Sequence, residues 1–202
     1  MDCVFKAREH IDIVWRIAEQ LEVTGTHKNR FISAMFFASI NHCDAIQVLT
    51  KQRNFASSFA LLRPLLENTF RAVWLHNCAS IEQSQKAMIK GKWPSAWDAI
   101  NSIEELSGCP KLLSKIWSDM RNHMHDFTHG GSELAYRHFG EDNVITPNVD
   151  DSEVLRLIQI VVLVSSYVLS QHIELSENEK AIRLLERLVD QSTSWCFTTG
   201  CG

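Results

Sequence analysis

The sequence predicts an all-α protein: an up-and-down helical bundle of six to eight helices in a single domain, residues 1–202. Glycine and proline, the residues that turns need, account for only 12 of 202 residues (8 glycines and 4 prolines), roughly half their usual share. Hydrophobic residues make up 45% of the chain, enough for a core, which excludes intrinsic disorder. Apolar residues recur at spacings of three and four over long stretches, the period of an amphipathic helix.

The first half of the chain predicts three long helices. Residues 4–23 carry one apolar stripe, and residues 28–52 are apolar around most of the helix, which predicts a central position. The third helix covers residues 55–78 and contains Pro64. Proline lacks an N–H and clashes with the preceding turn, so we expect a kink near residues 60–63, with a break into two helices as the alternative.

The second half predicts shorter helices and one long apolar helix. Residues 81–107 predict one or two short helices, and residues 110–129 predict a helix that ends at the Gly-Gly pair which follows it. Ser176 and Glu179 have the spacing of a capping box, which predicts the start of the last helix.

The long apolar helix is expected over residues 150–174. Its segment 157–173 has 17 residues without a formal charge, fewer than the roughly 20 needed to span a bilayer. Acidic residues flank both ends, so no positive-inside signal is present. We interpret it as a buried core helix, or as a dimer helix that would make the protein a homodimer.

Charge and cysteine content restrict the function classes. Lys plus Arg is 20 and Asp plus Glu is 24, a formal charge of −4, which argues against broad non-specific DNA binding. The six cysteines contain no Cys-x-x-Cys pair, so neither a zinc ribbon nor a redox motif is indicated. The sequence start lacks the basic and apolar regions of a signal peptide. We therefore expect a soluble, cytoplasmic protein with free thiols and no membrane contact.

The first candidate site is a polar stripe in the third helix. Arg63, Glu67 and Arg71 stand at i, i+4 and i+8, so they lie on one helix face. A carboxylate between two guanidiniums would hold both in fixed orientation. The stripe predicts a clamp for an anion or a phosphate group, with an intrahelical salt-bridge ladder as the structural alternative.

The second candidate site is a histidine-rich stripe. Arg121, His125 and His129 repeat the same spacing, and Asp126 lies one step aside. Two imidazoles on one face suit acid–base chemistry near neutral pH, and an arginine can stabilise an anionic intermediate. We predict His129, His125, Arg121 and Asp126 as catalytic residues. The alternative is a solvated polar helix end.

A metal site is a weaker alternative. His125-x3-His129 is also the spacing of helical zinc ligands, and His42 in an apolar seam would be the third ligand. A lone histidine in such a seam is more often a core residue, so we predict no metal. The sequence contains no glycine-rich phosphate loop, and no cofactor is expected.

Several segments resemble those of a family of uncharacterised bacterial all-helical proteins. They are Phe59-Ala-Leu-Leu-Arg63-Pro-Leu-Leu-Glu67, Arg71-Ala-Val-Trp74, Asp126-Phe-Thr128-His129-Gly130, Arg137 and Ile145-Thr-Pro147-Asn-Val-Asp150. The chain is more loosely similar to the HEPN superfamily, helical bundles that include metal-independent ribonucleases and nucleotide-binding modules of toxin–antitoxin and phage-defence systems. A third similarity, to DinB-like metal-binding bundles, rests on the three histidines named above.

The HEPN resemblance implies a nucleotide or RNA partner. Its ribonuclease signature is an arginine followed by a histidine after four to six residues, whereas here His125 follows Arg121 after three residues and His129 after seven. The resemblance therefore implies nucleotide binding more directly than cleavage. The alternative from another class is a non-enzymatic helical interaction protein whose polar stripes hold helices in register.

Overall fold

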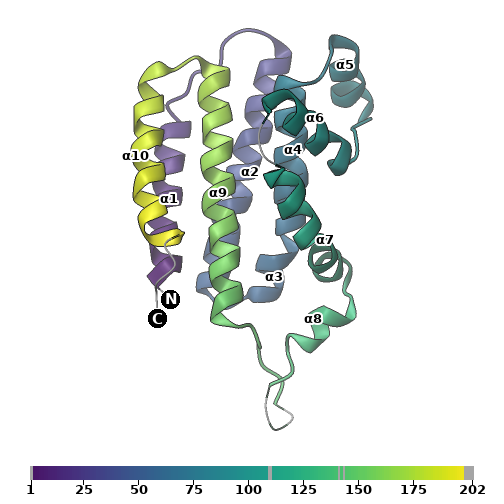
Figure 1. Ribbon diagram of the computed structural model, residues 1–202, viewed down its shortest axis with the longest axis vertical. Coiled ribbons are helices and arrows are strands. Elements are labelled where there is room, and N and C mark those ends of the chain that lie inside the picture. The colour runs from purple at the N-terminus through teal and green to yellow at the C-terminus, as the bar shows by residue number, and fades with distance from the viewer. Residues whose placement is uncertain (1, 109–110, 141, 143, 198–202) are drawn as a thin grey trace.

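The computed structural model describes residues 2–108, 111–140, 142 and 144–197. In this part of the chain ten helices form a bundle without a β-sheet (Figure 1), which confirms the all-α prediction. They are α1 (Asp2–Ala18), α2 (His27–Lys51), α3 (Phe55–Ala60), α4 (Leu62–Asn77), α5 (Ile81–Lys90), α6 (Ala96–Ser107), α7 (Leu112–His129), α8 (Ser132–Tyr136), α9 (Asp151–Ser176) and α10 (Glu179–Cys196).

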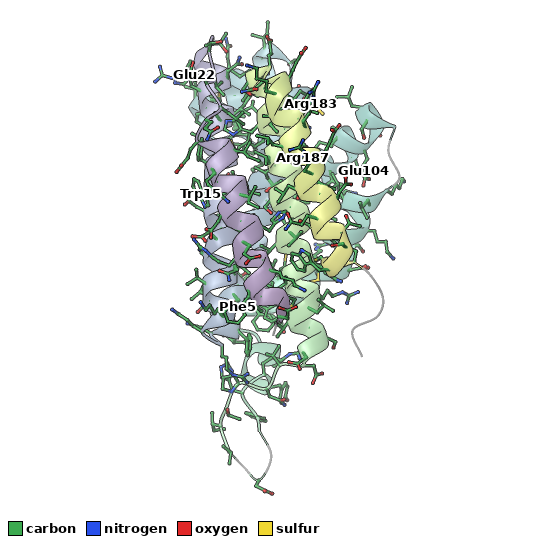
Figure 2. The ribbon with its side chains drawn as sticks, turned by 90° about the vertical axis from the view of Figure 1, so that its left-hand side faces the viewer. Phe5, Trp15, Glu22, Glu104, Arg183 and Arg187 are labelled. Carbon is green, nitrogen blue, oxygen red and sulfur yellow. The ribbon has the colours of Figure 1, made fainter. Side chains whose placement is uncertain are left out.

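Helix α2 is central, as its sequence predicts. It packs against α1, α4 and α9, and its side chains Phe36 and Ile40 are fully buried. Its first turn is capped by Thr26, whose hydroxyl accepts a hydrogen bond from the Asn29 N–H (3.2 Å), the usual role of a threonine at this position. Helices α1 and α10 lie side by side on α9, with the start of α1 and the end of α10 at the same end of the bundle (Figures 1 and 2).

Helix α9 buries its apolar length inside the chain. It begins after Asp150, whose N–H donates to the Glu153 carboxylate (3.2 Å), and it packs on α1, α2, α4 and α10. By length and composition alone, α2 and α9 could each cross a membrane, a property that core helices of soluble proteins share. The internal packing of α9 accounts for its apolar sequence.

Pro64 separates two helices. The expected helix over residues 55–78 is broken at Leu61 into α3 and α4, so the alternative to a single kinked helix is correct. Pro64 is the third residue of α4, where an N–H has no intrahelical partner to lose. The break changes the direction of the chain just before Arg63.

Other helix boundaries differ from the expected ones. The described helices exceed the predicted six to eight because α3 separates from α4 and because Ser132–Tyr136 forms the short helix α8. The expected capping box at Ser176 is wrong: Ser176 is the last residue of α9, and Asn178 caps α10 by accepting from the Ala181 N–H (3.2 Å).

Four of the six cysteines lie in the described part of the chain. Cys3, Cys43, Cys78 and Cys196 are free thiols. Burial raises the pKa of the Cys196 thiol to about 11, which keeps it protonated and unreactive near neutral pH. Cys109, Cys201 and Pro110, the expected start of the helix over residues 110–129, lie outside the described residues.

Candidate functional site

The first polar stripe lies on α4 as the spacing predicts. Arg63 donates from Nε to Glu67 Oε1 (2.9 Å), and Arg71 Nη2 lies 3.4 Å from Glu67 Oε2. The three side chains are 32%, 22% and 35% exposed, so the stripe is half-buried. Arg71 Nε is buried and has no hydrogen-bond partner among the described residues. Glu67 therefore orients both guanidiniums.

Helix α7 brings the second stripe to the first. Two ring contacts fix its packing: Phe59 stacks on Phe127 with ring centroids 5.0 Å apart, and Phe70 meets Trp117 edge-on at 6.1 Å. The later residue of α7, Phe127, contacts the earlier Phe59, and the earlier Trp117 contacts the later Phe70, so α7 runs antiparallel to α3 and α4. The C-terminal end of α7 therefore lies beside the N-terminal end of α4, where Arg63 is.

The start of α7 is held by a residue of another helix. No side chain at its own N-cap accepts a hydrogen bond, and the Ser114 N–H donates instead to Glu104 Oε1 of α6 (2.9 Å). A carboxylate also stabilises the positive end of the helix dipole. The buried Glu104 thus positions the helix that carries the histidines.

The two stripes meet directly at one contact. Arg63 Nη1 lies 3.2 Å from His129 Nε2, although the residues are 66 positions apart. A guanidinium can only donate, so His129 Nε2 accepts and its ring proton sits on Nδ1. His125 lies beside His129 with ring centroids 4.7 Å apart. Both imidazoles are therefore gathered at the arginine–glutamate stripe.

Asp126 and Arg121 are the other two predicted site residues of α7. His125 Nδ1 lies 3.9 Å from Asp126 Oδ1, an ion-pair distance when the imidazole is protonated, and the His125 side chain is 65% exposed. Asp126 also lies against the chain reversal that ends α7: a Cβ on Gly131 would come within 2.5 Å of its Cγ. Arg121 is exposed one turn before His125.

The described side chains contain no group of three or more histidines, cysteines or carboxylates that could hold a metal ion. His42 on α2 therefore does not complete a set of ligands with His125 and His129. Burial lowers the pKa of His42, which favours its neutral form and fits the alternative reading as a core residue.

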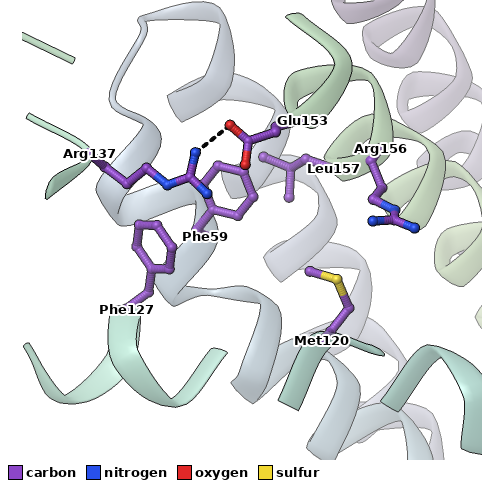
Figure 3. A pocket seen from close by; sticks show the side chains of 7 residues that line it. All are labelled: Phe59, Met120, Phe127, Arg137, Glu153, Arg156 and Leu157. Atoms are coloured by element: carbon purple, nitrogen blue, oxygen red, sulfur yellow. Dashed lines mark hydrogen bonds and ion pairs between the residues drawn. The ribbon is translucent and has the colours of Figure 1, made fainter. Parts of the chain in front are cut away.

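A second feature was not predicted from the sequence. Arg137, which follows α8, forms an ion pair with Glu153 of α9 beside a cavity of about 60 Å³ (Figure 3). Phe59 and Phe127 form part of its wall, and Arg156 lies at its opposite side. The sequence contains a weak signal for this pair, a lone arginine in the loop region before α9, but no spacing rule connects it to Glu153.

The comparisons with known proteins identify a family but no function. The family model of DUF6988, described as a family of unknown function, matches residues 36–195. That match includes α3, α4, α7 and α9, and so every residue of both stripes. No curated protein and no solved structure matches the chain. The match covers most of the sequence, and the chain therefore belongs to DUF6988.

Proposed function

We propose that Arg63, Arg71, Arg121, His125 and His129, hereafter the anion cluster, bind the phosphate group of a nucleotide or of RNA. The contact between Arg63 and His129 carries the proposal, because it joins two segments that each supply cationic or hydrogen-bonding groups. Guanidiniums recognise phosphate oxygens by paired, charge-assisted hydrogen bonds. The proposed protein is soluble and cytoplasmic.

The charge balance of the anion cluster supports an anionic ligand. Arg63 and Arg71 share one carboxylate, Glu67, and the stripe on α7 adds Arg121 and the carboxylate of Asp126. The donors that a ligand can reach belong to the partly exposed guanidinium of Arg71 and the exposed guanidinium of Arg121. A phosphate that approaches this surface gains several cationic donors at once.

Cleavage of a phosphodiester is the activity that the two imidazoles would support. His129 and His125 lie close enough to act on one phosphate group, one as the base and the other as the acid. Arg71 or Arg121 would stabilise the charge that builds on the phosphate oxygens. A role in a toxin or phage-defence system follows from the HEPN resemblance alone and is part of the same proposal.

The binding step is tested by calorimetric titration with AMP and with a short single-stranded RNA. We expect Arg63→Gln to weaken binding at least tenfold, because a hydrogen bond to a charged group contributes about 1.5–3 kcal/mol. The matched control is Arg183→Gln, which removes an exposed arginine of α10 (Figure 2). Equal affinity of Arg63→Gln and the unmodified protein, or no binding by either, would contradict the proposal.

Glu67→Gln separates an anion site from a salt-bridge ladder. If the stripe binds phosphate, removing the negative charge between Arg63 and Arg71 is expected to strengthen AMP binding several-fold, since the carboxylate no longer competes with the ligand. If the stripe only holds the helix, the variant loses stability and AMP affinity does not rise. Urea unfolding and AMP titration of the same preparation distinguish these results.

A further inference from the structure

Helices α7 and α9 leave a trough between them. Both pack on α4, but they make almost no direct contact with each other. Two cavities of about 60 Å³ and about 170 Å³ lie between them and share two lining residues, Met120 of α7 and Arg156 of α9. The two cavities are therefore neighbouring parts of one trough, hereafter the α7–α9 trough.

The wall of the α7–α9 trough is mainly apolar. The smaller, more enclosed end is lined by Phe59, Phe127 and Leu157 (Figure 3). The larger end is lined by Ile116, Ile160, Leu163 and Phe197. Transfer of an apolar chain from water to a wall of such side chains is favourable, because apolar surface of both is removed from water.

One charged side chain in the trough, that of Arg156, has no ion-pair partner among the described residues. Arg137 is paired with Glu153, and Asp119 lies 4.0 Å from Lys115. Within the described part of the chain, Arg156 forms neither an ion pair nor a hydrogen bond, and it lies where the two cavities join. The trough thus combines apolar walls with a single cation whose charge is not matched.

We propose that the α7–α9 trough binds an amphipathic monocarboxylate: a single alkyl chain that lies along the apolar wall, with its carboxylate on Arg156. The guanidinium offers the paired donors that a carboxylate accepts. One unpaired cation matches a single negative charge, and the cavity volumes suit one short alkyl chain. The occupant is a free acid with one alkyl chain, because a diacyl phospholipid carries two long chains.

This site is separate from the anion cluster. At 3.6 residues per turn, Phe127 and His129 point about 160° apart around α7. Phe127 faces the trough, whereas His129 faces Arg63. The proposal does not depend on phosphate binding, and either site can fail its test without the other.

The test is calorimetric titration with butanoate, hexanoate, octanoate and octan-1-ol. We expect affinity to rise about fourfold per methylene as each group leaves water, until the chain fills the trough. Arg156→Gln is expected to weaken octanoate binding about tenfold and to leave octan-1-ol binding unchanged. Leu163→Trp fills the larger end and is expected to weaken both ligands, whereas Leu184→Trp on exposed α10 is the matched control.

Three outcomes would overturn the proposal. They are affinity that does not depend on chain length, equal loss of octanoate and octan-1-ol binding in Arg156→Gln, and unchanged octanoate binding in Leu163→Trp. Should Leu163→Trp fail to fold, Arg156→Gln decides the question, since its side chain is exposed. Octanoate at saturation is expected to leave AMP affinity unchanged, which keeps this result distinct from that of the anion cluster.

Discussion

Acidification from pH 7 to pH 5 is expected to lower the free energy of unfolding by about 4 kcal/mol, about 2 kcal/mol from each of two buried histidines. Burial lowers the pKa of His10 and of His172 from 6.5 to about 4. His10 joins three helices: its Nδ1 lies 2.6 Å from the Ser192 hydroxyl and its Nε2 lies 3.1 Å from that of Ser165. His172 Nε2 lies 3.0 Å from the Ser33 hydroxyl.

The sign of this effect follows from which state binds the protons. Between pH 6.5 and pH 4 the unfolded chain takes up protons at these imidazoles and the folded chain does not. Stability is therefore complete above pH 6.5, decreases as the pH falls to about 4, and levels off below that. Burial lowers the pKa of His76 as well, which adds to the loss in the same direction.

Urea unfolding at pH 7, 6 and 5 measures the effect. His10→Gln is expected to lose about half of the pH dependence, because one of the two main titrating groups is gone. The control is His125→Asn, which removes an imidazole that is 65% exposed. A stability that is flat between pH 7 and pH 5, or an unchanged slope in His10→Gln, would contradict this account.

Phe70→Ala is expected to lower the free energy of unfolding by about 3–5 kcal/mol, the usual cost of removing a buried phenyl ring. Phe70 is buried, and its ring meets Trp117 of α7 edge-on at 6.1 Å. This contact holds α7 against α4. Its loss therefore also separates the histidines from Arg63 and Arg71, and AMP binding is expected to fall at least tenfold.

The matched control is Phe36→Ala. Phe36 is fully buried in α2, where its ring contacts His76 and His172. We expect a similar loss of stability by urea unfolding, but AMP affinity that stays near that of the unmodified protein at a temperature where both variants are folded. If the two variants lose AMP affinity equally, the packing of α7 on α4 does not control the site.

The local parts of the site could be predicted from the sequence. Spacing of four residues places Arg63, Glu67 and Arg71 on one helix face whatever the fold is, and the ion pairs confirm that arrangement. The same rule places His125 beside His129. The scarcity of glycine and proline identified the fold class for an equally local reason, since few residues were available to end helices.

The contacts between segments could not be predicted in this way. That Arg63 meets His129 depends on the break at Leu61 and on the antiparallel packing of α7, which is determined by Phe59, Phe70 and their ring partners. Apolar periodicity shows which face of a helix is buried but not against which helix. The same limit applies to the ion pair of Arg137 with Glu153 and to the position of Arg156 in the trough.

The most direct test of the anion cluster is a long-range ¹H–¹⁵N NMR spectrum of the histidine side chains, recorded with and without AMP. In the free protein, His129 is expected to carry its proton on Nδ1 and to accept from Arg63 at Nε2. AMP at a concentration that half-saturates the unmodified protein is expected to shift its His129 and His125 ring signals and to shift them much less in Arg63→Gln. Imidazole signals that do not move while AMP binds would place the ligand elsewhere and contradict the account.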